Sequence, residues 1–283
     1  MTDTDAFEAQ RLRLTRLAYR MLGSVAEAQD AVQDAWLRWT RAGEEIADPA
    51  AWLVRVTSRL CIDRLRAAKT QRAAYRGPWL PEPLIEELSV DPVERAEDVS
   101  VAFLLALERL SPLERAVFLL HDVFDEDYAD VAETLGKTEP AVRQLATRAR
   151  AHIKETRPRF TVSQEDAAKL AAAFMMAAAQ GDMAALSAML AEDAVMVTDG
   201  GGKRKAALRP LIGREDIVRL MEGLAWRGDS QPLSFRAVRI NGYPGLVLEG
   251  VDGPSTVAFQ PGEDGKLVGI YTVRNPDKLG HLA

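Results

Sequence analysis

Basic and polar side chains gather on one side of a predicted helix near the middle of the chain, where their chemistry suits contact with duplex DNA. Apolar residues at steps of three and four from Val142 to Ile153 predict that the opposite side is buried. Arginine can read guanine and glutamine can read adenine in the major groove, and flanking cations neutralise phosphates. The candidates are Thr138, Arg143, Gln144, Thr147, Arg148 and Arg150.

A short helix must precede this one to position it on DNA. The apolar spacing from Tyr128 to Leu135 predicts such a helix, Gly136 ends it, and Thr138 can cap a second helix that begins at Glu139. Two helices joined in this way can place the second one in the major groove. An ordinary helical hairpin with a charged outer face has the same pattern, so the motif by itself leaves both interpretations open.

The distribution of charge favours nucleic acid. The 283 residues have a formal net charge of −6, which by itself argues against a polyanionic partner. Residues 51–76, however, carry seven basic side chains against one acid, and residues 137–159 carry seven against two. Residues 77–100 carry seven acids against one arginine. A single charged run is usually a solvated helix face, but two basic runs on patterned helices favour a nucleic-acid surface.

The scarcity of cysteine and histidine excludes several kinds of site. Cys61 is the one cysteine and the three histidines are far apart, so the sequence predicts no internal disulfide, no metal site and no cofactor. Neither a signal peptide nor an apolar run long enough to span a membrane is found, and we expect a cytoplasmic protein without membrane contact.

Periodicity and proline content divide the chain into four parts. Residues 5–70 predict a helical bundle, in which one helix begins after Ser24 and a basic one begins at Pro49. Three prolines between 78 and 83 predict an extended linker over residues 71–95. Residues 96–157 contain the helix-turn-helix. Residues 160–283 read as helices followed by strands with glycine turns, which predicts an α+β domain with an antiparallel sheet.

Three motifs, in this order, resemble those of a bacterial sigma factor of the extracytoplasmic-function class, which contains sigma regions 2 and 4. Ala28–Trp36 is similar to the region 2 helix that docks on the clamp helices of RNA polymerase. The segment from Ala51 to Arg66 is similar to the one that melts and reads the −10 element. Val131–Gly136 and Gln144–Ala151 together resemble the −35 reader of region 4.

This resemblance implies roles for particular residues and particular partners. The residues implied in polymerase binding are Glu27, Asp30, Gln33 and Asp34, although acids on one helix face are commonly just solvated. The residues implied in −10 binding are Arg55, Arg59, Arg64 and Arg66, and a basic helix of this kind suits a single strand. The implied partners are the clamp helices and flap of core RNA polymerase and promoter DNA, with no separate anti-sigma factor and a monomer when free.

Three further motifs resemble the SigJ-like group of these factors, which carries a C-terminal SnoaL-like domain. They consist of Trp79, Leu80, Pro81, Glu82 and Pro83, then Asp199, Gly200, Gly201, Gly202 and Lys203, and then Asn275, Pro276, Asp277, Lys278 and Leu279. The resemblance implies two all-α sigma domains, a region 2 bundle and a region 4 helix-turn-helix, followed by an α+β SnoaL-like cone. It also implies that the cone modulates the sigma unit.

The sequence gives less support to other roles for the last domain. Its glycine turn lacks the first glycine and the Ser/Thr of a phosphate loop. SnoaL-like cones can be enzymes, but this one has a single histidine, His281, and we assign no catalytic residue. A small-molecule pocket stays open beside the favoured regulatory contact. We therefore expect a non-enzymatic sigma factor that directs promoter-specific initiation, and the alternative is a stand-alone DNA-binding regulator with a ligand-sensing domain.

Overall fold

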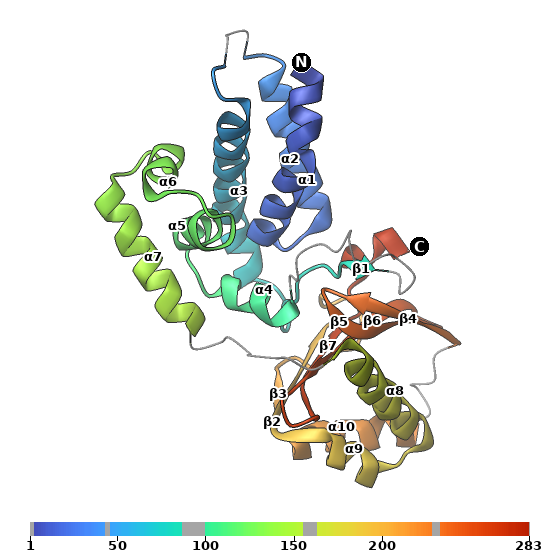
Figure 1. Cartoon of the computed structure of the whole chain (residues 1–283). Helices are drawn as coiled ribbons and strands as arrows, with labels where there is room; N and C mark the ends of the chain where they lie inside the picture. The colour runs from blue at the N-terminus through green and yellow to red at the C-terminus, as the bar shows by residue number, and fades with distance from the viewer. Residues whose placement is uncertain (1–2, 43–45, 87–99, 155–162, 228–232, 283) are drawn as a thin grey trace. The chain divides into compact units, whose positions relative to one another are not determined.

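The computed structural model describes residues 3–42, 46–86, 100–154, 163–227 and 233–282 (Figure 1). The chain forms two compact units. The first unit combines residues 1–73 with residues 102–157, and the second combines residues 74–101 with residues 158–283. The segment that joins the sigma-like regions in sequence therefore belongs, in space, with the C-terminal domain.

The first unit is entirely helical in its described residues. Its helices are α1 Asp3–Leu22, α2 Val25–Trp39, α3 Pro49–Ala73, α4 Val101–Glu108, α5 Pro112–Phe118, α6 Tyr128–Leu135 and α7 Glu139–Lys154, with a π-helical turn at Leu119–Val123. Helices α1, α2 and α3 pack against one another, and the buried side chains of Leu14, Ala28 and Leu53 lie in their core. The predicted bundle is confirmed.

Side-chain caps fix several of these helix ends, as the sequence indicates. The Ser24 hydroxyl accepts a hydrogen bond from the Glu27 amide at 3.3 Å. Ser111 and Glu114 form a complete capping box at the start of α5. Gly136 ends α6 in the left-handed conformation with φ 61°, which glycine adopts without the strain of a side chain.

The described residues of the second unit form three helices and one mixed sheet. Its elements are β1 Ile85–Glu86, α8 Gln164–Gln180, α9 Met183–Met189, β2 Leu190–Asp199, β3 Leu211–Ile212, α10 Arg214–Arg227, β4 Ser234–Ile240, β5 Tyr243–Gly250, β6 Gly253–Pro261 and β7 Leu267–Val273, then short 3-10 turns at Pro276–Lys278 and Gly280–Leu282. The strand order is β1-β4-β5-β6-β7-β2-β3. Phe174 and Phe259 meet in the core between the helices and the sheet, with ring centroids 5.7 Å apart.

The expected α+β class is confirmed, but the expectation of an antiparallel sheet is wrong at one place. Strand β2, which was not predicted from the sequence, pairs with β7 in parallel. The sequence does not show this strand because its start is irregular. Glu192 and Asp193 are exposed there, and the register shifts between Leu190 and Val195. A bulge of this kind breaks the alternation by which a strand is recognised.

The proline-rich segment is extended and forms part of the second unit. No helix occurs from residue 77 to residue 86, and Ile85 and Glu86 pair with Ile240 and Arg239 of β4. The Leu84 amide donates to Asn241 Oδ1 at 3.1 Å. Leu80 is buried, so this linker contributes to the folded domain. Among the described residues, no helix is long and apolar enough to cross a membrane.

Candidate nucleic-acid interface and linker site

Helix α7 separates a buried face from an exposed face as the sequence predicts. The side chains of Val142, Leu145, Ala146, Ala149 and Ile153 are buried. The −35 candidates on the helix are all exposed, namely Arg143, Gln144, Thr147, Arg148 and Arg150, and Thr138 is exposed just before its start. The buried face packs on α5 and α6, which fixes the direction of the exposed one. This geometry suits insertion into a major groove.

Acidic neighbours hold several of these cations in place. Arg143 binds Glu139 one turn earlier, with an Nε–Oε1 distance of 3.0 Å. Arg150 Nε donates to Asp122 Oδ1 at 2.6 Å, and this bond is the main reason that the pKa of Arg150 is raised. Arg148 lies 3.4 Å from Glu114. The arginine of each pair is largely exposed, and an ion pair with a solvent-exposed cation is weak, so phosphates can replace the acids.

The structure divides the four −10 candidates between different sides of α3. At 3.6 residues per turn, Arg59 and Arg66 lie within about 40° of Arg55, whereas Arg64 lies about 180° away. Arg64 faces α2, where its guanidinium binds Asp34 at 2.7 Å and the Glu27 carbonyl oxygen at 2.8 Å. The periodicity alone would have revealed this separation.

Arg55 and Arg59 contact the helix-turn-helix. Arg55 binds Glu133 of α6, and Arg59 Nε donates to the Thr134 carbonyl oxygen at 3.0 Å. Arg66 binds only a local partner among its described contacts, Asp63, at 3.3 Å. Two arginines expected to meet single-stranded DNA are therefore occupied by the first helix of the −35 motif.

The polymerase-binding candidates on α2 are also divided. Glu27, Asp30 and Gln33 are exposed, whereas Asp34 is half-buried and bound to Arg64. Their opposite face carries the buried apolar stripe of α2. An exposed surface with two acids, Glu27 and Asp30, and the neutral Gln33 therefore persists.

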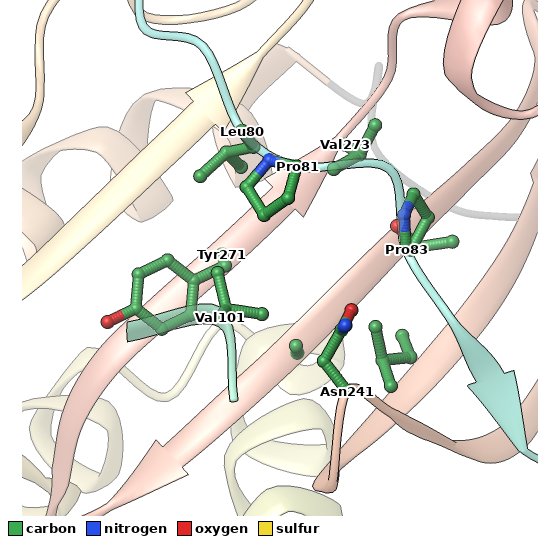
Figure 2. A pocket seen from close by; sticks show the side chains of 10 residues that line it. Leu80, Pro81, Pro83, Val101, Asn241, Tyr271 and Val273 are labelled. Carbon is green, nitrogen blue, oxygen red and sulfur yellow. The ribbon is translucent and has the colours of Figure 1, made fainter. Parts of the chain in front are cut away.

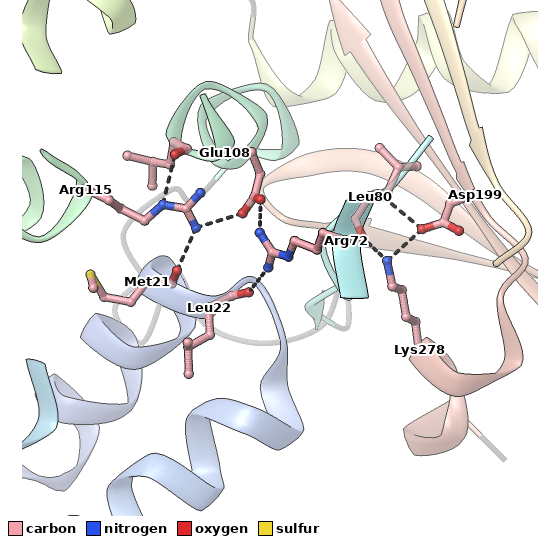
Figure 3. Close-up of polar contacts among 9 residues, drawn as sticks. Met21, Leu22, Arg72, Leu80, Glu108, Arg115, Asp199 and Lys278 are labelled. Atoms are coloured by element: carbon pink, nitrogen blue, oxygen red, sulfur yellow. Dashed lines mark hydrogen bonds and ion pairs between the residues drawn. The ribbon is translucent and has the colours of Figure 1, made fainter. Parts of the chain in front are cut away.

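A buried arginine cluster, which was not predicted from the sequence, joins α1, α3, α4 and α5 (Figure 3). Arg115 donates to the carbonyl oxygens of Met21 and Leu107 at 2.7 and 2.9 Å and to Glu108 at 2.7 Å. Arg72 binds the same Glu108. Burial lowers the pKa of Arg115 to about 10, and burial together with the Arg115 charge lowers the pKa of Arg72 to about 10. Both arginines carry charge at neutral pH and complete the packing of α4 on the bundle.

In the second unit, the three SigJ-like motifs meet at Asp199 (Figure 3). Its carboxylate is 0 % exposed and accepts hydrogen bonds from the Leu80 amide at 2.9 Å and Lys278 Nζ at 2.7 Å. It also accepts bonds from the Tyr75 hydroxyl at 2.6 Å and the Gly201 amide at 2.9 Å. We call Tyr75, Leu80, Asp199, Asn275 and Lys278 the Asp199 cluster. Each motif supplies one or more of its members.

Aromatic and amide contacts complete the Asp199 cluster. Lys278 Nζ lies 4.1 Å from the ring centroid of Trp79 and binds the Leu80 carbonyl oxygen. Asn275 Nδ2 donates to the Tyr75 hydroxyl at 2.8 Å. Burial, and then the bond to Asp199, raises the pKa of Tyr75, so the phenol stays protonated. Exposed Lys203 and Asp277 form a separate ion pair at 2.6 Å.

Prolines of the linker cover a small hollow on the sheet (Figure 2). Leu80, Pro81 and Pro83 line it on one side, and Asn241 and Tyr271 line it on the other. Its cavity volume of about 10 Å³ has room for about one water molecule, far below the about 300–1,000 Å³ of ordinary ligand pockets. The linker thus fills most of the space over this part of the sheet.

The fold and the two basic helices define a protein with sigma regions 2 and 4. Residues 6–71 match the family described as Sigma-70 region 2, and residues 100–153 match Sigma-70, region 4. The ECF RNA polymerase sigma factor SigJ of Mycobacterium tuberculosis is 40% identical over 98% of this chain and 93% of its own length. The chain belongs to the extracytoplasmic-function sigma factors.

Two other similarities agree with this assignment. The crystal structure of M. tuberculosis SigJ superposes with a TM-score of 0.79 at 37% identity and covers 98% of each chain. The probable ECF sigma factor SigI of the same organism is 39% identical over 65% of this chain and 66% of its own length. The fold of two helical sigma regions followed by a C-terminal mixed-sheet domain is therefore shared with a known member.

Proposed function

We propose that this protein binds core RNA polymerase and directs promoter-specific initiation, with α7 reading the −35 duplex and the Arg55–Arg59–Arg66 side of α3 contacting melted −10 DNA. The observation that carries the proposal is the exposed basic face of α7, whose opposite face is buried. Glu27 and Asp30 offer an acidic surface to the polymerase clamp helices, with the neutral Gln33 beside them, and region 4 would meet the flap. Family membership supports both contacts.

The C-terminal domain, in this proposal, modulates initiation by holding the linker. Between α3 and α4 lie residues 74–100, which is 27 residues, and 74–86 are folded on the second unit. With residues 74–86 held on the second unit, only the remaining 14 residues can change their length, and they reach about 50 Å when fully extended. Capture of the linker therefore gives one part of the connection a fixed span and places the second unit between the −10 and −35 readers along the chain.

The proposal includes several finer features. The protein acts in the cytoplasm as a monomer when free, catalyses no covalent chemistry, and requires no separate anti-sigma factor because its own domain holds the linker. Affinity purification from the native cell tests the last feature, since recovery of a stoichiometric inhibitory protein would contradict it.

Two experiments test the proposal as a whole. A pull-down with purified core polymerase should recover the full-length chain, whereas a stand-alone DNA-binding regulator needs no tight core complex. In run-off transcription, alanine at Arg143, Gln144 and Thr147 should reduce use of the cognate promoter, at about 1–3 kcal/mol for each base-reading contact. Unchanged promoter choice by this triple variant would refute the assignment of α7. Deletion of residues 160–283 should alter promoter output while core binding persists.

A further inference from the structure

The aromatic ring of Tyr128, at the first residue of α6, contacts the leading candidate for base reading. Arg143 Cζ lies 4.3 Å from its ring centroid. The same ring stacks on His121 at 3.8 Å, and His121 Nδ1 is 2.7 Å from the Glu126 carbonyl oxygen. Tyr128 is half-buried, so its position is set by α6 and by this stack before any DNA arrives.

The contacts of Arg143 leave one edge of its guanidinium available. Glu139 Oε1 accepts from Nε and from one terminal nitrogen, so it occupies one side of the planar group. Arginine has five N–H donors in a fixed fork, and the two terminal nitrogens can still donate end-on as a pair. A guanine in the major groove presents O6 and N7 to such a pair. The ring below and the carboxylate beside it fix the plane in which that pair lies.

Rotational freedom explains why this matters for recognition. An arginine side chain loses about 2 kcal/mol of rotamer entropy when fixed, and a donor that is already fixed loses less on binding. A cation over an aromatic ring gains about 0.5–1 kcal/mol at exposed sites. We infer that Tyr128 is a positioning residue for base reading, because it holds the guanidinium of Arg143 in the orientation that meets a base edge. This inference rests on the proposed role of α7.

Tyr128 makes a second, separable contact. Hydrogen bonding to the Tyr128 side chain contributes to the raised pKa of Arg150, after the larger effect of Asp122. The hydroxyl thus serves Arg150, whereas the ring serves Arg143. Tyr128→Phe removes the contact with Arg150 and keeps the contact with Arg143, whereas Tyr128→Leu removes both.

The test compares base preference among full-length variants bound to core polymerase. The probes are duplexes randomised over the −35 element of one promoter that the wild-type holoenzyme uses, and the readout is enrichment of each base at each position. Arg143→Ala identifies the position that Arg143 reads. Tyr128→Leu should lower the preference at that position by about two- to fivefold and leave the other positions unchanged. Tyr128→Phe should keep the wild-type preference there, and Tyr128→Leu should add nothing to Arg143→Ala.

Each alternative outcome is decisive. If Tyr128→Leu leaves the Arg143-dependent position unchanged, or weakens all positions equally, Tyr128 does not position Arg143. An additive effect in the double variant would also overturn the positioning role. Should Tyr128→Leu lower the melting temperature, Tyr128→Met, which fills space adaptably, replaces it. If Arg143→Ala leaves the base preference unchanged at every position, the proposed role of Arg143 itself is wrong. This outcome distinguishes a failure of the proposed function from a failure of the positioning role.

Discussion

Replacement of Asp199 by alanine should remove much of the stability of the second unit. The carboxylate is 0 % exposed and accepts hydrogen bonds from two segments that are far from it in sequence, the linker with Tyr75 and Leu80 and the C-terminal turn with Lys278. In Asp199→Ala the Lys278 ammonium, whose side chain is 12% exposed, loses its carboxylate partner. The Leu80 amide and the Tyr75 hydroxyl lose an acceptor at the same time.

The size of the effect follows from this burial. Removing one member of a buried ion pair costs about 3–5 kcal/mol, because the other charge stays in a medium of low polarity. The free energy of unfolding of a folded domain is only about 5–15 kcal/mol in total. Asp277→Ala is the matched control, since it also removes an aspartate bound to a lysine, but that pair is more than half exposed on both sides. We expect the control to cost less than about 1 kcal/mol.

Denaturant unfolding of the full-length variants measures the loss of stability in Asp199→Ala and in Asp277→Ala. Trypsin cleavage after exposed Arg76, which follows Tyr75 directly, reports release of the linker and should accelerate in Asp199→Ala only. The double variant Asp199→Ala, Lys278→Met should recover part of the loss, because it removes the unpaired charge. A loss no larger than that of Asp277→Ala, or a double variant that is less stable than Asp199→Ala, would refute this account of the Asp199 cluster.

Three shorter predictions concern the first unit. Glu133→Gln removes the charged partner of Arg55 and should strengthen binding of a single-stranded −10 oligonucleotide about two- to fivefold, the value of one partly exposed pair; fluorescence anisotropy that shows no gain over a Glu8→Gln control would contradict it. Arg115→Leu leaves two buried carbonyls without their donor, while Glu108 keeps Arg72, and it should destabilise the unit by about 3–5 kcal/mol in denaturant melts, so a change under about 1 kcal/mol would count against it. Burial raises the pKa of the Cys61 thiol to about 12, so below that pH the folded protein holds it as the unreactive thiol. At pH 8 a disulfide reagent should therefore label it only in denaturant, and rapid labelling of the native chain would show the site to be open.

Local patterns predicted the recognition helix well, because everything that defines it lies within one stretch. The buried face from Val142 to Ile153 repeats at the helical period, and glycine and threonine residues mark the turn before it. The separation of Arg64 from Arg55 was also available from that period, since nine residues correspond to two and a half turns. A count of the charges along α3 does not show this separation, because it ignores the side of the helix on which each charge lies.

Other features depend on partners distant in sequence and could not be predicted from local patterns. Arg115 looks like a solvent-facing residue of a short helix, yet it binds Met21, which is 94 positions away. Asp199 is the last residue of a strand with an irregular start, and its partner Leu80 is 119 positions away. Such residues show only their polarity in sequence, and burial reverses the meaning of that polarity.

The two basic surfaces differ in how accessible they are, and this gives promoter binding an order. The side chains of Arg143 and Arg148 are more than half exposed where they pair with Glu139 and Glu114, so phosphates or bases can replace those acids without moving a helix. Arg55 and Arg59 instead hold a side chain and a backbone carbonyl of α6, and Arg59 Nε cannot donate to that carbonyl and to DNA at once. Arg59 is exposed and its terminal nitrogens can still donate, but Arg55 and Arg59 Nε must give up their α6 contacts before those groups meet a melted strand. Under the proposed function, −35 contacts can form on the structure described, whereas full −10 contact by this side of α3 competes with its contacts to α6.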